Sequence, residues 1–260
     1  EVDADPRWVG NGRTVLNNKG KPVKQYEPYF SDNARYEDET ALREYGVTPV
    51  LHYDSAGRVI RTDMPDGTFT KVEFTPWEQV TWDQNDTVLE SRWYMDRGSP
   101  SAAGPEPVGS DYDKRAAFWA ALHAETPKTE FLDTLGRVFL LRDHNRNFTP
   151  VNVNVTPHSY TATDEFIDTR FELDIEGNQR SVTDALGRLI TVNTFNLTGE
   201  PVHTHSMDAG QRWMLTNAAG NPQFYASLAL DTLNRPHIAY YDSPSFGTGL
   251  LKYATYDGSA

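Results

Sequence analysis

The sequence has no cysteine among its 260 residues, which excludes disulfide bonds and metal sites built from thiolates. It also lacks any apolar run near the roughly eighteen residues that a membrane-spanning helix needs, so we expect no membrane span. Cations are scarce: 24 lysines and arginines face 37 aspartates and glutamates, for a formal net charge of −13. Because phosphate binding needs clustered cations, and the few lysines are scattered, we expect no nucleic-acid partner.

The chain begins at Glu1 rather than at a methionine, and no charged segment followed by an apolar one precedes it. We therefore expect a signal peptide to be absent or already removed.

Common catalytic motifs are also missing. The sequence contains no Gly-x-Ser-x-Gly, no His-Glu-x-x-His and no glycine-rich phosphate loop. The nearest alternative is His203-Thr-His205, because a strand would place both imidazoles on one face, where they could share a metal with His123, His144 or His158. Two histidines on a solvated strand are more often spectators, so we expect no cofactor, no metal and no enzymatic activity. A metal-dependent hydrolase centred on His203 and His205 is the third hypothesis for function.

A short motif recurs in this sequence. Asp-x-x-Gly-Arg followed directly by apolar residues occurs three times, and its fixed positions are Asp54, Gly57 and Arg58; Asp133, Gly136 and Arg137; and Asp184, Gly187 and Arg188. Looser copies keep an Asp or Asn first and a Gly or Asn three residues later, at 17–21, 174–178, 217–221 and 231–235. Asp and Asn close turns through their side chains, and Gly and Asn tolerate positive φ. Each copy therefore predicts a tight turn between two strands, and the repetition predicts an array of hairpins.

Longer sequence segments around these turns are also informative. Tyr53-Asp54-x-x-Gly57-Arg58 followed by Pro65-Asp66-Gly67-Thr68 resembles the tyrosine-aspartate repeat of Rhs and YD-repeat proteins. Four segments are similar to the B component of bacterial insecticidal toxin complexes and to related virulence-plasmid proteins: 12–28, 77–89, 172–180 and 207–210. The resemblance runs from about Trp8 to about Tyr225.

This resemblance implies a mainly β fold, in which repeated hairpins form an extended, curved or spiralling antiparallel sheet. In that family the sheet is a hollow shell around a toxic polypeptide, so the implied partners are other toxin-complex components or a polypeptide cargo, and the implied location is secreted or exported from bacteria. The family's self-cleaving border, with its Asp-Pro-x-Gly stretch, has no counterpart here, because the only Asp-Pro is Asp5-Pro6. We therefore expect no autoproteolysis.

Local patterns divide the chain into three parts. Residues 1–48 form a polar, turn-rich lead-in that predicts loop, with one helical turn within 31–44. Residues 49–225 predict the repeat sheet, and residues 226–260 predict three strands that resemble one propeller blade or cap the array. Within the sheet region we expect strands at 52–53, 59–62, 68–74, 79–82 and 88–94. A Pro/Gly/Ser-rich loop is expected at 97–110.

One helix is predicted near 111–125. Ser110 and Asp113 have the spacing of a capping box, and Thr126-Pro127 ends the helical pattern. Phe118, Trp119 and Leu122 fall on one face, which favours a helix that packs on a sheet face or plugs a hole in the sheet over a helix that docks a partner.

Aromatic residues make up 12% of the chain. Trp77, Trp82 and Trp93 gather in one stretch, and we expect them to be mostly buried between layers of strands. Aromatic faces also bind sugars, so a cell-surface or glycan-binding module is the alternative hypothesis to a shell segment that shields a polypeptide cargo.

Overall fold

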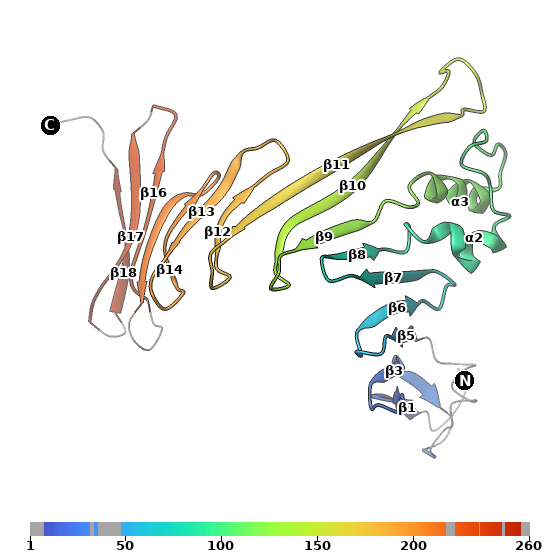
Figure 1. Ribbon diagram of the computed structural model, residues 1–260, viewed down its shortest axis with the longest axis horizontal. Coiled ribbons are helices and arrows are strands. Elements are labelled where there is room, and N and C mark those ends of the chain that lie inside the picture. The colour runs from blue at the N-terminus through green and yellow to red at the C-terminus, as the bar shows by residue number, and fades with distance from the viewer. Residues whose placement is uncertain are drawn as a thin grey trace. The chain divides into compact units, whose positions relative to one another are not determined.

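The computed structural model describes residues 8–31, 34–35, 48–216, 222–233, 235–245 and 248–255. The chain divides into two compact units. The first comprises Glu1–Thr129 with Asp143–Phe166, and the second comprises Glu130–Arg142 with Ile167–Ala260. Antiparallel strands dominate both units (Figure 1), so the mainly β prediction is confirmed. The predicted curvature, and the division near residues 48 and 225, stay predictions.

In the first unit, successive strands pair as antiparallel neighbours in the order β2-β3-β5-β6-β7-β8. Strands β1 and β4 pair with each other and form a separate two-stranded sheet. Their bounds are Trp8–Gly10 (β1), Thr14–Leu16 (β2), Pro22–Gln25 (β3), Tyr29–Ser31 (β4), Val50–Tyr53 (β5), Val59–Asp63 (β6), Phe69–Phe74 (β7) and Glu78–Trp82 (β8). Strands therefore occupy part of the lead-in that was predicted as loop. Most of the segment predicted to hold a helical turn, 31–44, lies outside the described residues.

A helical insert follows β8. It contains a 3-10 helix η1 at Val88–Glu90, α2 at Arg92–Asp96 and α3 at Tyr112–Leu122. The predicted strand at 88–94 is therefore wrong. The Ser91 hydroxyl accepts a hydrogen bond from the Tyr94 backbone N–H, and this N-cap starts a helix where apolar periodicity alone suggested a strand.

The predicted helix is confirmed as α3, but its cap is different. Asp111, and not Ser110, is the N-cap: its side chain accepts a hydrogen bond from the Lys114 backbone N–H. The helix packs on the neighbouring helical turns, because Ala117 and Ala121 form a buried cluster with Val88 and Tyr94. On its other side the rings of Phe118 and Trp119 contact the ring of Tyr160 on β11.

The core of the first unit lies around this insert. Phe118, Ala117 and Leu122 are buried. Asp86 ties the two ends of the insert together, since its carboxylate accepts hydrogen bonds from the Asp83 backbone N–H and from both the backbone N–H and the hydroxyl of Thr126.

Three strands contribute residues to both units: β9 at Lys128–Leu132, β10 at Val138–Pro150 and β11 at Tyr160–Leu173. Ion pairs link β10 to β11 within each unit. Arg142 binds Asp168 through two hydrogen bonds of 2.7 and 2.9 Å in the second unit, and Arg146 donates to Asp164 at 2.6 Å in the first.

In the second unit each strand pairs with the next in an antiparallel manner, from β11 to β18. The bounds are Gln179–Thr183 (β12), Leu189–Phe195 (β13), Pro201–Ser206 (β14), Gly210–Thr216 (β15), Pro222–Leu230 (β16), Pro236–Ser245 (β17) and Thr248–Thr255 (β18). The three strands expected in the last part of the chain are β16, β17 and β18, and β16 pairs with β15.

The second unit has almost no core of its own. Of its residues whose side-chain burial the structure describes, only Ala226 is buried, at 8% exposure. Register places Thr194, His203, Trp213 and Ala226 in one row across neighbouring strands, a mixture of small, polar and aromatic side chains. This sheet is therefore a layer with two half-exposed faces.

Within the described ranges, no helix is long and apolar enough to cross a membrane.

Candidate functional site

The recurring motif forms a five-residue hairpin loop, which the copy at Asp133 illustrates. The backbone N–H of Asp133 donates to the Arg137 carbonyl at 2.9 Å, and the Gly136 N–H donates to the Asp133 carbonyl at 2.9 Å. The Asp133 carboxylate then accepts hydrogen bonds from the backbone N–H groups of Leu135 and Arg137, and from the Arg137 guanidinium at 2.7 Å. One carboxylate thus holds both the loop backbone and the side chain that directly precedes the next strand.

The other copies repeat this arrangement. Asp54 binds the Arg58 backbone and guanidinium, and Asp184 binds those of Arg188. The loop at 196–200 was not among the predicted copies of the motif. It has the same geometry, with Asn196 at the position of the aspartate. Loops 17–21, 174–178 and 231–235 belong to the same class. Loop 217–221 lies outside the described residues.

The glycines of these loops have positive φ: 81° at Gly57, 75° at Gly136 and 76° at Gly187. Side chains rarely adopt this conformation. At Gly57 and Gly187 the loop also shifts the strand register by one residue, between His52 and Tyr53 and between Val182 and Thr183, which is the geometry of a type I turn with a glycine bulge.

Loops at the same edge of a unit stack on one another. The last side chain of one loop covers the glycine of the next: a Cβ built on Gly57 would lie 2.5 Å from Lys21 Cε, and one on Gly177 would lie 3.4 Å from Arg137 Cδ. Arg137 also donates to the Asp174 carbonyl at 3.1 Å. The repeat therefore specifies contacts between successive hairpins as well as the turn within each hairpin.

The arginine of each motif changes the acidity of its aspartate. Hydrogen bonds from the Arg137 guanidinium and backbone hold the pKa of the Asp133 carboxyl below its ordinary value of 3.8. Hydrogen bonds from Arg188 lower the pKa of Asp184 in the same way. A carboxyl whose pKa is lower in the folded chain stabilises the fold above its unfolded pKa, and this stabilisation is lost as pH falls through the folded value.

We therefore expect the variant Asp133→Asn to melt at a lower temperature than the natural chain at neutral pH, and the difference to shrink below about pH 4. Asparagine keeps the acceptor for the backbone, as Asn17 and Asn196 do, but loses the ion pair. Thermal melts across pH measure this, with Asp208→Asn, an exposed carboxylate outside the motif, as control. A difference that stays constant from neutral to acidic pH would contradict the assignment.

The three tryptophans are not buried between layers, which corrects the prediction. Trp77 is 60% exposed in the turn between β7 and β8. Trp82 and Trp93 are half-buried, and each is covered by a cation: Lys71 Nζ lies 4.6 Å from the Trp82 ring centroid, and Arg97 Cζ lies 4.1 Å from that of Trp93. The prediction assumed a second layer of strands, whereas one long cationic side chain covers each ring, and Trp93 also packs against the buried cluster around Val88 and Tyr94.

The two candidate metal ligands have different surroundings. His203 is half-buried against the Trp213 ring, with centroids 4.9 Å apart, whereas His205 is exposed. Both lie on β14 at alternate positions, so they share a face as expected. Among the described residues, no group of three histidines, aspartates or glutamates is placed to hold a metal ion. The absence of a metal stays a prediction.

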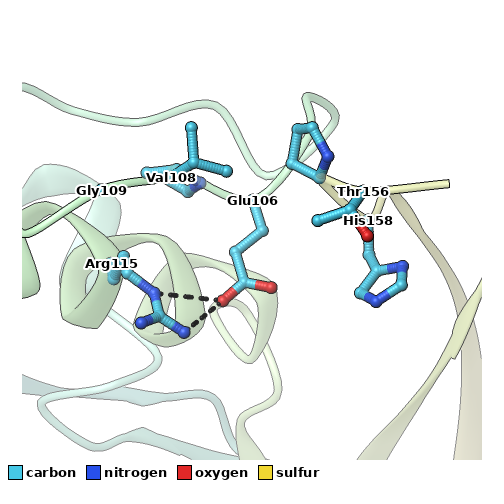
Figure 2. A pocket seen from close by; sticks show the side chains of 8 residues that line it. Glu106, Val108, Gly109, Arg115, Thr156 and His158 are labelled. Atoms are coloured by element: carbon cyan, nitrogen blue, oxygen red, sulfur yellow. Dashed lines mark hydrogen bonds and ion pairs between the residues drawn. The ribbon is translucent and has the colours of Figure 1, made fainter.

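A pocket that the sequence did not predict lies in the first unit (Figure 2). Glu106 is at its centre. Its Oε1 accepts hydrogen bonds from Arg115 Nη2 at 2.8 Å and Nε at 3.2 Å, and from Trp119 Nε1 at 3.3 Å. Its Oε2 accepts a hydrogen bond from the Tyr160 hydroxyl at 3.3 Å.

The network changes the acidity of its members. Hydrogen bonds from Arg115 hold the pKa of Glu106 below its ordinary value, so the carboxylate is charged at neutral pH. Desolvation, followed by the Glu106 charge, raises the pKa of the Tyr160 hydroxyl, which keeps it a donor. One sequence signal could have indicated this site, namely the spacing of Arg115 and Trp119 on one face of α3, but no pattern linked these two residues to Glu106 or Tyr160.

No family model matches this chain, and no curated protein matches it. Solved structures do. The chain is similar to TcdB2-TccC3, with a TM-score of 0.65 and 23% identity over 95% of this chain and 11% of that one. It is similar to TcdB2-TccC3-Cdc42, with a TM-score of 0.63 and 23% identity over 95% of this chain and 11% of that one. The Photorhabdus luminescens Tc holotoxin pore gives a TM-score of 0.63 and 24% identity over 94% and 11%.

The fold is shared with these toxin-complex chains. This chain spans 11% of their length, so the likeness establishes the fold and not the activity or partners of the whole neighbours.

Proposed function

We propose that this chain is a wall segment of a bacterial toxin-complex-like shell, built from Rhs-type YD repeats, which shields a polypeptide cargo and is not itself a catalyst. The observation that carries the proposal is the second unit, a sheet of paired hairpins with almost no core. In an ordinary domain, a β-sheet buries at least one of its faces against another layer of secondary structure. A sheet that leaves both faces half-exposed suits a wall with solvent on one side and contents on the other.

Two further observations support the proposal. The hairpin loops stack through repeated contacts, such as Arg137 on loop 174–178, which favours lateral extension of the sheet. The similarity to toxin-complex chains supports a role within such an assembly and export from a bacterial cell. The partners are then other toxin-complex components and the cargo.

The two faces of the second unit provide the test. His205 and Arg212 lie on the adjacent strands β14 and β15 and are both exposed. Register pairs His205 with Gln211 and Arg212 with Thr204, so the two side chains point to opposite faces. Either position accepts a photo-crosslinking amino acid, and the protein is purified in the assembly that forms in its own cells.

A wall segment should crosslink to enclosed polypeptide from one of these two positions only, because only one face is turned inward. Crosslinks from both faces alike, or from neither, would contradict the proposal. His205 and Arg212 are matched positions, because their side chains lie on opposite faces of the sheet but at nearly the same distance from its edges.

The non-catalytic part of the proposal makes a separate prediction. We expect the double variant His203→Ala and His205→Ala to fold normally, and the purified natural chain to contain no stoichiometric transition metal after dialysis. Circular dichroism and elemental analysis measure these results. About one zinc per chain, lost in the double variant, would instead favour the metal-dependent hydrolase.

A further inference from the structure

The pocket beside Glu106 has a volume of about 200 Å³ and lies between the loop 106–109, α3 and residues 156–158. Figure 2 shows the Glu106 and Arg115 side chains joined on one side and His158 on the other. Pro107, Val108 and Pro157 supply apolar surface around these polar groups. The pocket is smaller than those that hold drug-sized ligands, so it suits a single small ring or side chain.

Hydrogen-bonding capacity remains inside the pocket. A carboxylate offers about four lone-pair positions. The bonds from Arg115, Trp119 and Tyr160 place three donors on Oε1 of Glu106 and one on Oε2, so Oε2 retains a position. Arg115 uses its Nε and Nη2 groups on Glu106, and a guanidinium has five N–H donors.

His158 lines the other side of the pocket. Its backbone carbonyl accepts a hydrogen bond from the Glu106 N–H at 2.7 Å, which fixes this loop against the one that carries Glu106. The pocket therefore holds both donors and acceptors in fixed positions.

Charge indicates what kind of ligand these groups would take. Glu106 and Arg115 form an ion pair at 2.8 Å and cancel one another, so neither an anion nor a cation gains a net attraction. An apolar peptide side chain would leave the free position on Glu106 and the remaining N–H groups of Arg115 desolvated and unpaired, which is costly. A neutral molecule with several hydroxyls satisfies these groups, and its C–H surface fits the prolines and Val108.

We propose that this pocket binds one sugar residue of a neutral glycan. Its hydroxyls donate to Glu106 and accept from Arg115. Tyr112 is 74% exposed and lies on the same face of α3 as Arg115, so it offers a ring to a neighbouring sugar. This binding activity goes beyond the shell role and does not depend on it.

The test is titration of the full chain with the methyl glycosides of glucose, galactose, mannose and N-acetylglucosamine, followed by saturation-transfer NMR and calorimetry. We expect at least one of them to bind with a Kd near about 1 mM. Val108→Phe fills the pocket from an exposed position. It should weaken binding at least about tenfold while leaving the thermal melt unchanged.

The control is Trp77→Ala, which removes an exposed aromatic ring elsewhere in the same unit and should leave sugar affinity unchanged. Failure of all four glycosides to bind would overturn the proposal, and so would binding that survives Val108→Phe. If leucine amide binds in the pocket and the glycosides do not, the site serves a peptide and the proposal is wrong.

Discussion

Replacing Phe118 by alanine should lower the free energy of unfolding by about 3–5 kcal/mol, because truncating a fully buried aromatic ring removes its burial and leaves a cavity. Phe118 is 0% exposed, on the face of α3 that packs into the core. Its ring also contacts those of Trp119 and Tyr160, with centroids 5.9 and 6.3 Å apart. Urea unfolding followed by tryptophan fluorescence measures the loss.

The matched control is Phe139→Ala, on β10 in the second unit, where the ring is 44% exposed. We expect it to cost much less, since a half-exposed side chain gains little from burial in the isolated chain. Equal losses in the two variants would contradict the conclusion that the core lies around the helical insert.

Replacing Gly136 or Gly187 by valine should each cost about 1–3 kcal/mol, because a β-branched residue is strained at positive φ. A Cβ at either position would meet nothing within 4 Å, so the cost comes from the backbone and not from a clash. Gly57→Val should cost at least as much, since its Cβ would also displace the end of the Lys21 side chain.

Gly136→Asn is the control, because asparagine tolerates this region and the sequence itself has Asn234 at the equivalent place of loop 231–235. We expect its thermal melt to stay close to that of the natural chain. Unchanged melts in all three valine variants would remove the repeat interpretation, and an asparagine variant as unstable as the valine variant would show that the side chain's bulk, not φ, is decisive.

The turns could be predicted from sequence because their chemistry is local. Asp133, Gly136 and Arg137 lie within five residues, and each contributes a group that the loop needs. Strand bounds followed from the turns: the predicted strands at 59–62 and 79–82 match β6 and β8 within one residue. The helix α3 was also predictable, since a short polar-to-apolar pattern between a cap and a proline suffices.

Other features depend on tertiary context. The segment 88–94 has apolar residues at both ends and polar ones between them, a pattern that suits a strand or a helix equally, and the Ser91 cap that decides between them contributes a single hydrogen bond. The burial of Trp82 and Trp93 depends on which long side chains cross them. The Glu106 pocket joins residues up to 54 positions apart, and no local pattern brings Glu106 to Tyr160.

Cryo-electron microscopy of the native assembly, purified from the cells that make it, can show whether the sheet of this chain is part of a wall around a polypeptide. We expect β12 to β18 to continue into neighbouring strands of the assembly, with one face toward a lumen that contains polypeptide density and the other toward solvent. An assembly in which both faces of this sheet are in open solvent, or in which it encloses no density, would contradict this expectation.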